Sequence, residues 1–227
     1  MQIPSIPATN LLDEQGRSEP FYIRRIICIG RNYEDHAIEM GHKPNEAPPF
    51  FFYKPLTALC SLEKLTRWPL PRYSDTVHHE LEVSIAIGKT PTKNSPEDCI
   101  IGFGVALDMT CRDIQKAAKS AGRPWDTAKG FDYSAPCSDL IKGDWQALAE
   151  LNDFSLTRNQ QLVQKGNIHN MIWPIPALLA QLQNFTELGA GDLILTGTPA
   201  GVGEVHSGDE LEATLKGTSA TLKLTVE

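Results

Sequence analysis

The clearest pattern in the chain is an alternation of apolar and polar positions over residues 77–88. Side chains on a strand point alternately to its two faces, so this alternation predicts a β-strand. Its apolar face is formed by His79, Leu81, Val83, Ile85 and Ile87. Glu80 and Glu82 then share the opposite face. Two carboxylates placed in this way on a half-buried strand repel each other unless a cation joins them.

A second strand is predicted over residues 101–108 and ends in Asp108. Its apolar side chains alternate with Gly102, Gly104 and Ala106, which we expect to leave space on the side of Asp108. Three carboxylates supply only oxygen ligands, and such a set suits Mg²⁺, Mn²⁺ or Ca²⁺ better than zinc. The alternative interpretation is a solvent-facing strand whose two glutamates serve solubility, and these segments alone favour neither.

The rest of the pattern predicts more strands than helices. Residues 1–20 are polar and turn-prone and predict an irregular lead-in to a domain over residues 21–227. Further strands are predicted at residues 21–30, 50–54, 192–196, 211–215 and 220–226, with a hairpin at 156–167. Helices are predicted at residues 32–41, 110–121 and from Pro174 or Pro176 to about 185, and residues 122–132 predict an aperiodic loop. Because strands and helices do not alternate regularly, the predicted fold class is α+β with a β-dominated core.

Composition narrows the classes of function. The 227 residues carry a formal net charge of −7 and no basic stripe, which argues against a nucleic-acid partner. The five cysteines are scattered without a metal-ligand spacing and predict reduced, buried thiols. No apolar run approaches the length of a membrane span, and the N-terminus lacks the hydrophobic core of a signal peptide. We therefore expect a cytoplasmic protein without a membrane partner.

The predicted helix at residues 32–41 carries a candidate catalytic pair. Asn32 is its expected N-cap, with Asp35 at the third helical position. His36 and Glu39 are three residues apart and so face the same way, just after Arg31. A glutamate that holds one imidazole nitrogen leaves the other free to act as a base near neutral pH. The alternative is an incidental pair on a surface helix.

Several cationic and polar side chains adjoin these segments. Lys54 follows a run of aromatic residues, so its stem is predicted to be buried and its amino group directed to a specific partner. Arg112 and Gln115 lie three residues apart on the helix that begins just after Asp108, which predicts that both project toward that carboxylate. Lys129 lies in the aperiodic loop, where a lysine is usually solvated.

Glycine-rich segments suggest nucleotide sites but do not satisfy their requirements. Residues 197–203 lack the GK[ST] ending of a phosphate loop, and no helix is predicted to follow them. This segment is better interpreted as a rigid loop that presents backbone amides and the Thr198 hydroxyl. His78 and His79 point to opposite faces of a strand and do not make a zinc site by themselves.

Five segments, spread in order between Ile26 and Leu224, together resemble the fumarylacetoacetate hydrolase superfamily. They are IGRNYEDH, HHELE, ALDMTCRDIQ, GRPWDTAKGFD and GDLILTGTPAGVG. The resemblance implies a β-rich roll of stacked mixed sheets with a few short helices, usually assembled as a homodimer. About twenty-five residues precede the first motif, which is too few for the large extra N-terminal domain of fumarylacetoacetate hydrolase itself. The chain is most similar to the short acylpyruvase and oxaloacetate decarboxylase or tautomerase branch.

The resemblance also implies a role for each candidate residue. It implies that Glu80, Glu82 and Asp108 bind Mg²⁺ or Mn²⁺, and that His36 and Glu39 activate water on a short lid helix. Lys129 is similar to the active-site lysine, and we expect a lowered pKa for it beside a dication. The implied substrate-binding residues are Arg31, Lys54, Arg112, Gln115 and Thr198.

The expected substrates are small anionic 2-oxo acids, processed through an enolate that the metal stabilises. The candidate reactions are hydrolysis of the C–C bond of acylpyruvates, decarboxylation of oxaloacetate and its keto–enol tautomerisation. Two alternatives stay open. One is an isomerase or decarboxylase of 2-hydroxy-dienedioates in aromatic catabolism, and the other is a non-catalytic protein that binds a small molecule.

Overall fold

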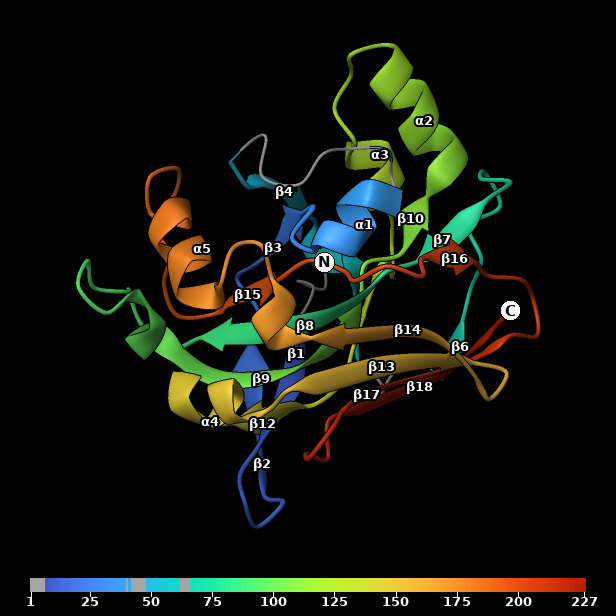
Figure 1. Cartoon of the computed structure of the whole chain (residues 1–227). Coiled ribbons are helices and arrows are strands. Elements are labelled where there is room, and N and C mark those ends of the chain that lie inside the picture. The colour runs from blue at the N-terminus through green and yellow to red at the C-terminus, as the bar shows by residue number, and fades with distance from the viewer. Residues whose placement is uncertain (1–6, 40, 42–47, 62–65) are drawn as a thin grey trace, which may run out of the picture.

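Strands dominate the computed structural model, which describes residues 7–39, 41, 48–61 and 66–227 (Figure 1). The first nine strands are β1 (Ala8–Leu12), β2 (Ser18–Tyr22), β3 (Arg25–Gly30), β4 (Phe50–Lys54), β5 (Leu59–Ser61), β6 (Arg67–Trp68), β7 (Val77–His79), β8 (Leu81–Ile87) and β9 (Ile100–Leu107). The others are β10 (Thr110–Cys111), β11 (Ala135–Cys137), β12 (Leu140–Lys142), β13 (Asp153–Arg158), β14 (Gln161–Asn167), β15 (Asp192–Leu195), β16 (Gly203–Glu204), β17 (Glu210–Leu215) and β18 (Thr221–Val226). The α-helices are α1 (Glu34–Glu39), α2 (Arg112–Ser120), α3 (Asp126–Lys129), α4 (Trp145–Glu150) and α5 (Ile175–Leu182). The predicted α+β class with a β-dominated core is confirmed.

The largest sheet brings the two predicted carboxylate strands together. Within the described residues it has ten strands, with the main order β2-β1-β12-β9-β8-β15-β3-β4. Parallel pairs, such as β15 with β3, mix with antiparallel pairs, such as β8 with β9. Because Leu81 of β8 lies opposite Leu107 of β9, the residue before β8 and the residue after β9 meet at one end of the pair.

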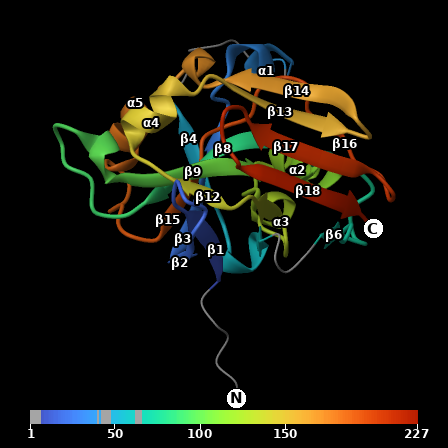
Figure 2. The ribbon, with the colours of Figure 1, turned by 90° about the horizontal axis from the view of Figure 1, so that it is seen from below.

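A second sheet, of β14, β13, β17, β18 and β6, covers one face of the large sheet. Figure 2 shows β14, β13, β17 and β18 side by side. Val83 and Phe103 from the large sheet join Phe154 and Leu211 from the second sheet in one buried apolar cluster. Removal of this much apolar surface from water is the main favourable contribution to folding. A small third sheet, of β10, β7 and β16, lies beside the carboxylate end of β8.

The other face of the large sheet is also buried, and there the structure corrects one prediction. Its cluster includes Leu11, Ala86 and Ala106. A Cβ atom added at Gly102 would lie 2.5 Å from Cδ1 of Leu11, and one at Gly104 would lie 2.6 Å from Oγ of Ser138. These glycines therefore make room for neighbouring protein segments, and the expectation that they leave open space on the side of Asp108 is wrong.

The predicted irregular lead-in is wrong for the described residues. Residues 8–22 contain β1 and β2, an antiparallel pair joined by a turn in which the Gly16 amide donates to the Asp13 carbonyl. The partner of β1 on its other side is β12, far along the chain, so the alternation within β1 is too short to identify the strand by itself. Pro20 is compatible with β2 because β2 is an edge strand. The strand predicted at 21–30 is divided between β2 and β3.

Two further predictions around the helices are wrong. Residues 122–132 are not an aperiodic loop throughout, because they contain α3. Asn32 does not cap α1 with its side chain. Its amide group instead donates to the carbonyls of Trp173 and Thr196 and accepts from the Trp173 amide, so it ties the start of α1 to the segment before α5. No helix in the described part of the chain is long and apolar enough to cross a membrane.

Candidate active site

Three carboxylates meet where β8 begins and β9 ends. Glu80 occupies the break between β7 and β8, and Asp108 directly follows β9. The Asp108 amide donates to the Glu80 carbonyl at 2.8 Å, which fixes the two backbones side by side. Glu80, Glu82 and Asp108 each offer a carboxylate oxygen, and these oxygens all lie within 4.8 Å of one another. All three side chains are buried, so the alternative of a solvent-facing strand is wrong.

Three cationic side chains contact two of these carboxylates. Lys129 Nζ donates to Oε2 of Glu80 at 2.7 Å and to Oδ2 of Asp108 at 2.6 Å. Arg112 Nη2 lies 2.6 Å from Oε1 of Glu80, and Lys54 Nζ lies 2.8 Å from Oδ1 of Asp108. Lys54 also donates to the carbonyls of Met109 and Lys129, so its predicted buried stem and specific partner are observed.

The shared charges shift the pKa values of the paired groups. Burial alone would lower the pKa of Lys129, but Asp108 and Glu80 outweigh it and raise the pKa to about 12. Burial would raise the pKa of Glu80, yet the positive charges of Lys129 and Arg112 hold it well below its usual range. The expected lowering of the Lys129 pKa is therefore wrong for these contacts, because the two carboxylates stabilise the charged amino group.

Glu82 differs from its two neighbours, because no described cation contacts it. Its Oε2 accepts a hydrogen bond from the Gly197 amide at 2.7 Å. Burial, followed by the charges of Asp108 and Glu80, raises its pKa well above the usual value. A buried carboxylate in this environment is stabilised by a cation shared with its neighbours. The donor set therefore fits a hard divalent ion such as Mg²⁺ or Mn²⁺.

The predicted pair on α1 lies at the same site. His36 Nδ1 is 3.3 Å from Oε2 of Glu39, and the Glu39 carboxylate also accepts from the Gly201 amide at 3.2 and 3.3 Å. Burial lowers the pKa of His36 more than Glu80 and Glu39 raise it. The imidazole is therefore neutral at pH 7, and its Nε2 is free to accept a proton if Nδ1 carries the hydrogen toward Glu39.

These residues line a small cavity of about 40 Å³. The lining contains every predicted site residue except Lys54 and Glu39. Lys54 contacts the lining residue Asp108, and Glu39 contacts the lining residue His36. Arg112 Nη1 donates to Oε1 of Gln115 at 2.8 Å, so the predicted proximity of these two side chains is observed. The remaining lining residues were not singled out as site residues in the sequence analysis, and they include Phe50, Phe52, Lys119 and Trp125.

Sequence reasoning also missed Gln164, a buried residue of β14 that joins two parts of the site. Its Oε1 accepts from the Leu81 amide and lies 2.9 Å from Nδ1 of His79. Its Nε2 donates to Oγ1 of Thr198 at 2.9 Å and to the Pro199 carbonyl at 3.0 Å. All four hydrogen-bonding positions of the amide are thus used. No local pattern in β14 distinguishes this glutamine from an ordinary strand residue.

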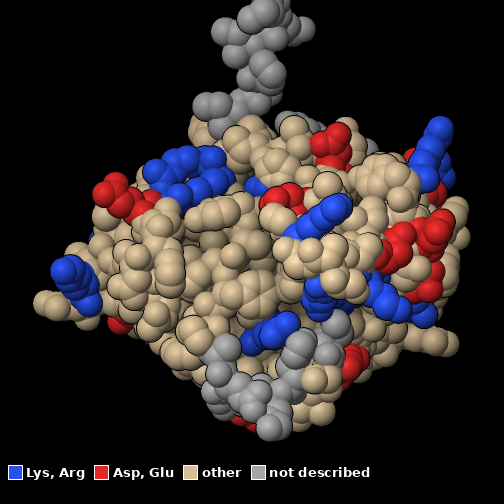
Figure 3. Space-filling model, turned by 90° about the horizontal axis from the view of Figure 1, so that it is seen from above, with Lys and Arg blue, Asp and Glu red and all other residues tan. Residues whose placement is uncertain are grey.

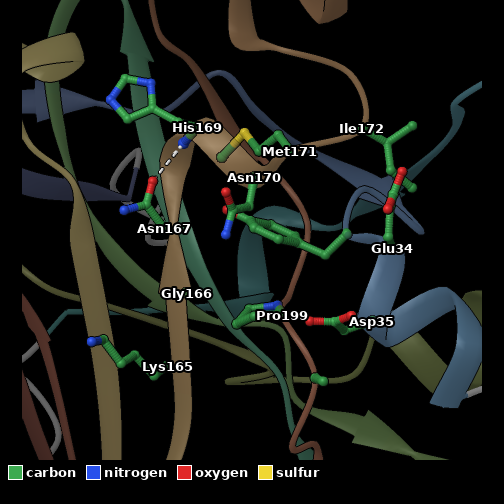
Figure 4. Close-up of a pocket in the computed structure, with 12 residues that line it drawn as sticks. Glu34, Asp35, Lys165, Gly166, Asn167, His169, Asn170, Met171, Ile172 and Pro199 are labelled. Carbon is green, nitrogen blue, oxygen red and sulfur yellow. Dashed lines mark hydrogen bonds between the residues drawn. The ribbon is translucent and has the colours of Figure 1, made fainter.

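A larger cavity, of about 400 Å³, borders α1 on another side and contains none of the three carboxylates. Figure 4 shows Glu34 and Asp35, from the first turn of α1, across this cavity from Lys165 and Asn167 of β14. Its lining brings together no group of metal ligands and no base paired with an acid like His36 and Glu39. The small cavity is the better candidate for chemistry, because it combines carboxylates, cations and a neutral imidazole.

Charged side chains are mixed on the face seen from the side of α1 and α2 (Figure 3). Lys and Arg side chains on this face lie among Asp and Glu side chains and are separated by uncharged surface. This distribution differs from the basic stripe that tracks a nucleic-acid backbone.

Comparisons with known proteins agree with this geometry. Residues 25–227 match the family model described as Fumarylacetoacetate (FAA) hydrolase C-terminal. The chain is 42% identical to oxaloacetate tautomerase YcgM of Escherichia coli (strain K12), over 92% of this chain and 96% of that protein. It is 38% identical to the mitochondrial oxaloacetate decarboxylase of Dictyostelium discoideum, over 89% and 94% of the two chains. A crystal structure of fumarylpyruvate hydrolase from Pseudomonas aeruginosa, in complex with Mn²⁺ and pyruvate, superposes with a TM-score of 0.91 at 35% identity, covering 100% of this chain and 98% of that one.

Proposed function

Because the chain belongs to the fumarylacetoacetate hydrolase family, we propose that it is a Mg²⁺- or Mn²⁺-dependent enzyme acting on 2-oxo carboxylates. The observation that carries this proposal is the buried trio of Glu80, Glu82 and Asp108, in which Glu82 has no cationic partner among the described residues. Support also comes from the E. coli tautomerase and the P. aeruginosa hydrolase, whose chains this one matches over nearly their whole lengths.

The three carboxylates are the residues that would hold the divalent ion. Lys54, Arg112 and Lys129 already compensate the charges of Glu80 and Asp108, whereas Glu82 contacts no described cation. A bound dication supplies Lewis-acid polarisation of the substrate's keto group. It also leaves the site with an excess of positive charge, which favours a substrate whose carboxylate and developing enolate carry two negative charges.

Arg112, Gln115 and Thr198 are placed to orient the substrate. All three line the cavity, and the Gln115 carbonyl oxygen already holds the Arg112 guanidinium. Gln164 donates to one lone pair of the Thr198 hydroxyl, and the nearest acceptor for the hydroxyl's own proton, the Pro199 carbonyl, is a poor one at 3.4 Å. Thr198 is therefore prepared to donate its proton to a substrate oxygen, while the protonated amino group of Lys129 can deliver a proton to the carbon next to the keto group.

His36 and Glu39 supply the function that distinguishes hydrolysis from the other reactions. Acylpyruvate cleavage needs a water molecule that loses a proton as it attacks. The neutral imidazole of His36 accepts that proton, and Glu39 stabilises the resulting imidazolium. Decarboxylation of oxaloacetate and its keto–enol tautomerisation need no water. One site therefore supports all three reactions, with His36 required mainly for the first.

Direct turnover assays test the proposal. Oxaloacetate tautomerisation and decarboxylation, acetylpyruvate hydrolysis and conversion of a 2-hydroxy-dienedioate are measured side by side, with Mg²⁺, with Mn²⁺ and with EDTA. We expect metal-dependent turnover of oxaloacetate or acetylpyruvate. Exclusive turnover of the dienedioate would favour the alternative isomerase or decarboxylase, and binding of a 2-oxo acid without turnover of any substrate would favour the non-catalytic alternative.

We also propose that the protein is a cytoplasmic homodimer. The five cysteines are all free and buried, as expected for a reducing compartment. Several large apolar side chains are exposed in the single chain, among them Ile38, Leu162 and Phe185. Light scattering coupled to size exclusion measures the assembly directly, and the mass of one 25.0 kDa chain would contradict the dimer.

A further inference from the structure

The outer part of the small cavity carries two cations that no described carboxylate neutralises. Arg31 and Lys119 both line this cavity. The guanidinium carbon of Arg31 lies 5.6 Å from the centroid of the Phe50 ring, and Nζ of Lys119 lies 5.0 Å from the centroid of the Trp125 ring. Ring contacts of this kind hold a cation in place without removing its charge. Both cations are thereby fixed at the cavity while remaining able to bind an anion.

These two cations differ from the cations deeper in the site. Lys54, Arg112 and Lys129 each contact a buried carboxylate, whereas Arg31 and Lys119 form no ion pair within the described part of the chain. Burial lowers the pKa of Lys119, and the positive charges of Arg31 and Arg112 lower it further. Because both side chains line the same small cavity, their like charges repel each other, and an anion between them would relieve that repulsion.

The lining of the small cavity indicates which part of a substrate reaches them. The three carboxylates and the two cations line one cavity of about 40 Å³, which has room for an ion and a few waters, since one water needs roughly 10–15 Å³. The carboxylates are buried and Lys119 is exposed, so a 2-oxo acid whose keto end lies at the carboxylates points its far end toward the opening, where Arg31 and Lys119 lie. Arg31, Phe50 and Trp125 are partly buried and Lys119 is exposed, and these outer lining residues are what the far end of the substrate would meet.

We propose that Arg31 and Lys119 bind the second carboxylate of a 2-oxo dicarboxylate and so select dicarboxylates over 2-oxo acids with an uncharged end. This inference rests on the proposed function, because it assumes that a 2-oxo group lies at the inner carboxylates. Arg31 offers a planar guanidinium that binds a carboxylate through two parallel hydrogen bonds. Lys119 adds a point charge from α2 at the same cavity. An aromatic mouth without these charges would favour an apolar end instead.

A matched pair of stable ligands tests this specificity. 2-Oxoglutarate and 2-oxovalerate have chains of the same length and differ in whether the far end is a carboxylate or a methyl group. Their affinities for the Mg²⁺-loaded protein are measured by titration calorimetry for the wild type, Arg31→Met, Lys119→Met and Lys119→Arg. Lys116→Met is the control, because Lys116 is an exposed residue of the same helix that does not line the cavity.

The wild type should prefer 2-oxoglutarate by about tenfold or more, which corresponds to about 1.4 kcal/mol. Each methionine variant at Arg31 or Lys119 should reduce that preference severalfold, Lys119→Arg should retain much of it, and Lys116→Met should leave it unchanged. Equal affinities in the wild type, or an unchanged preference in both methionine variants, would overturn the inference while leaving the proposed function intact. Failure of the wild type to bind or turn over any 2-oxo acid would overturn both.

Discussion

The amino group of Lys129 lies 2.6 Å from Oδ2 of Asp108, at the centre of the cluster that joins α3 to the end of β9. The same amino group donates to Glu80, so one lysine holds two of the three carboxylates together. A divalent ion bound by those carboxylates competes with this amino group for their oxygens. Lys129 thus has two functions, because it stabilises the metal-free fold and it is positioned for proton transfer.

Replacement of Lys129 by methionine should make the fold depend on the metal. Loss of one partner from a buried ion pair costs about 3–5 kcal/mol, because the remaining charges are left uncompensated. Thermal melts in EDTA should show a large loss for Lys129→Met, and Mn²⁺ should recover more stability in this variant than in the wild type. Lys142→Met is the control, since its ion pair with Glu19 is exposed. An equal gain from Mn²⁺ in both proteins would contradict the dual role.

Glu82→Gln should stabilise the metal-free protein and abolish its response to metal. The pKa of Glu82 is raised above 4.5 by burial and by Asp108 and Glu80. Between pH 4.5 and the raised pKa, the folded chain binds more protons than the unfolded chain. The contribution of Glu82 to the free energy of unfolding is therefore fully present below about pH 4.5 and is lost as the pH rises through the raised pKa. Glutamine keeps an oxygen to accept from the Gly197 amide but carries no charge.

The measurement for Glu82→Gln is urea unfolding in EDTA at about pH 5 and about pH 8. The difference in unfolding free energy between variant and wild type should grow with pH, to on the order of 1–3 kcal/mol. Addition of Mn²⁺ should then raise the stability of the wild type alone. A variant that is less stable than the metal-free wild type at both pH values would show that the Glu82 charge is already compensated.

Period-two alternation was sufficient to predict the two central strands and the shared location of their carboxylates, because β9 is continuous and β8 pairs with it along its length. It did not predict that the strand expected at residues 77–88 breaks at Glu80 into β7 and β8, which belong to different sheets. It could not predict β1, whose partner β12 is distant in the sequence. Nor could it predict Gln164, because its role depends on two other parts of the chain, around residues 79–81 and 198–199, that meet it only in the folded structure. Lys119 was missed for a related reason, since on its own helix it resembles any solvated lysine.

Gln164→Leu should reduce kcat even in the fraction of the protein that remains folded. The leucine leaves the Leu81 amide and the Pro199 carbonyl without their partners, at a cost of about 1–3 kcal/mol for each buried group. Because Thr198 also loses its donor, kcat should fall by at least about tenfold in the fraction that remains folded. Gln161→Leu, at the exposed start of the same strand, should change neither property. Full kcat in a folded Gln164→Leu protein would exclude a positioning role.

His36→Ala should separate hydrolysis from tautomerisation. If the neutral imidazole activates water, its loss should reduce acetylpyruvate hydrolysis by about 10²–10⁴-fold. Oxaloacetate tautomerisation needs no such water and should fall much less. Both rates are measured on the same Mg²⁺-loaded sample, with melting temperature as a check on folding. Equal losses in the two reactions would argue against His36 as the base for water.

The central claim is that Glu80, Glu82 and Asp108 bind a divalent ion on which turnover of 2-oxo acids depends. The most direct measurement combines Mn²⁺ titration calorimetry of the EDTA-stripped protein with oxaloacetate tautomerisation assayed on the same samples. Asp108→Asn is compared with Asp98→Asn, which alters an exposed carboxylate. We predict that one Mn²⁺ binds per chain, that activity returns in proportion to the bound ion, and that Asp108→Asn alone loses both. Full activity of the stripped wild type, or unchanged Mn²⁺ binding by Asp108→Asn, would contradict the claim.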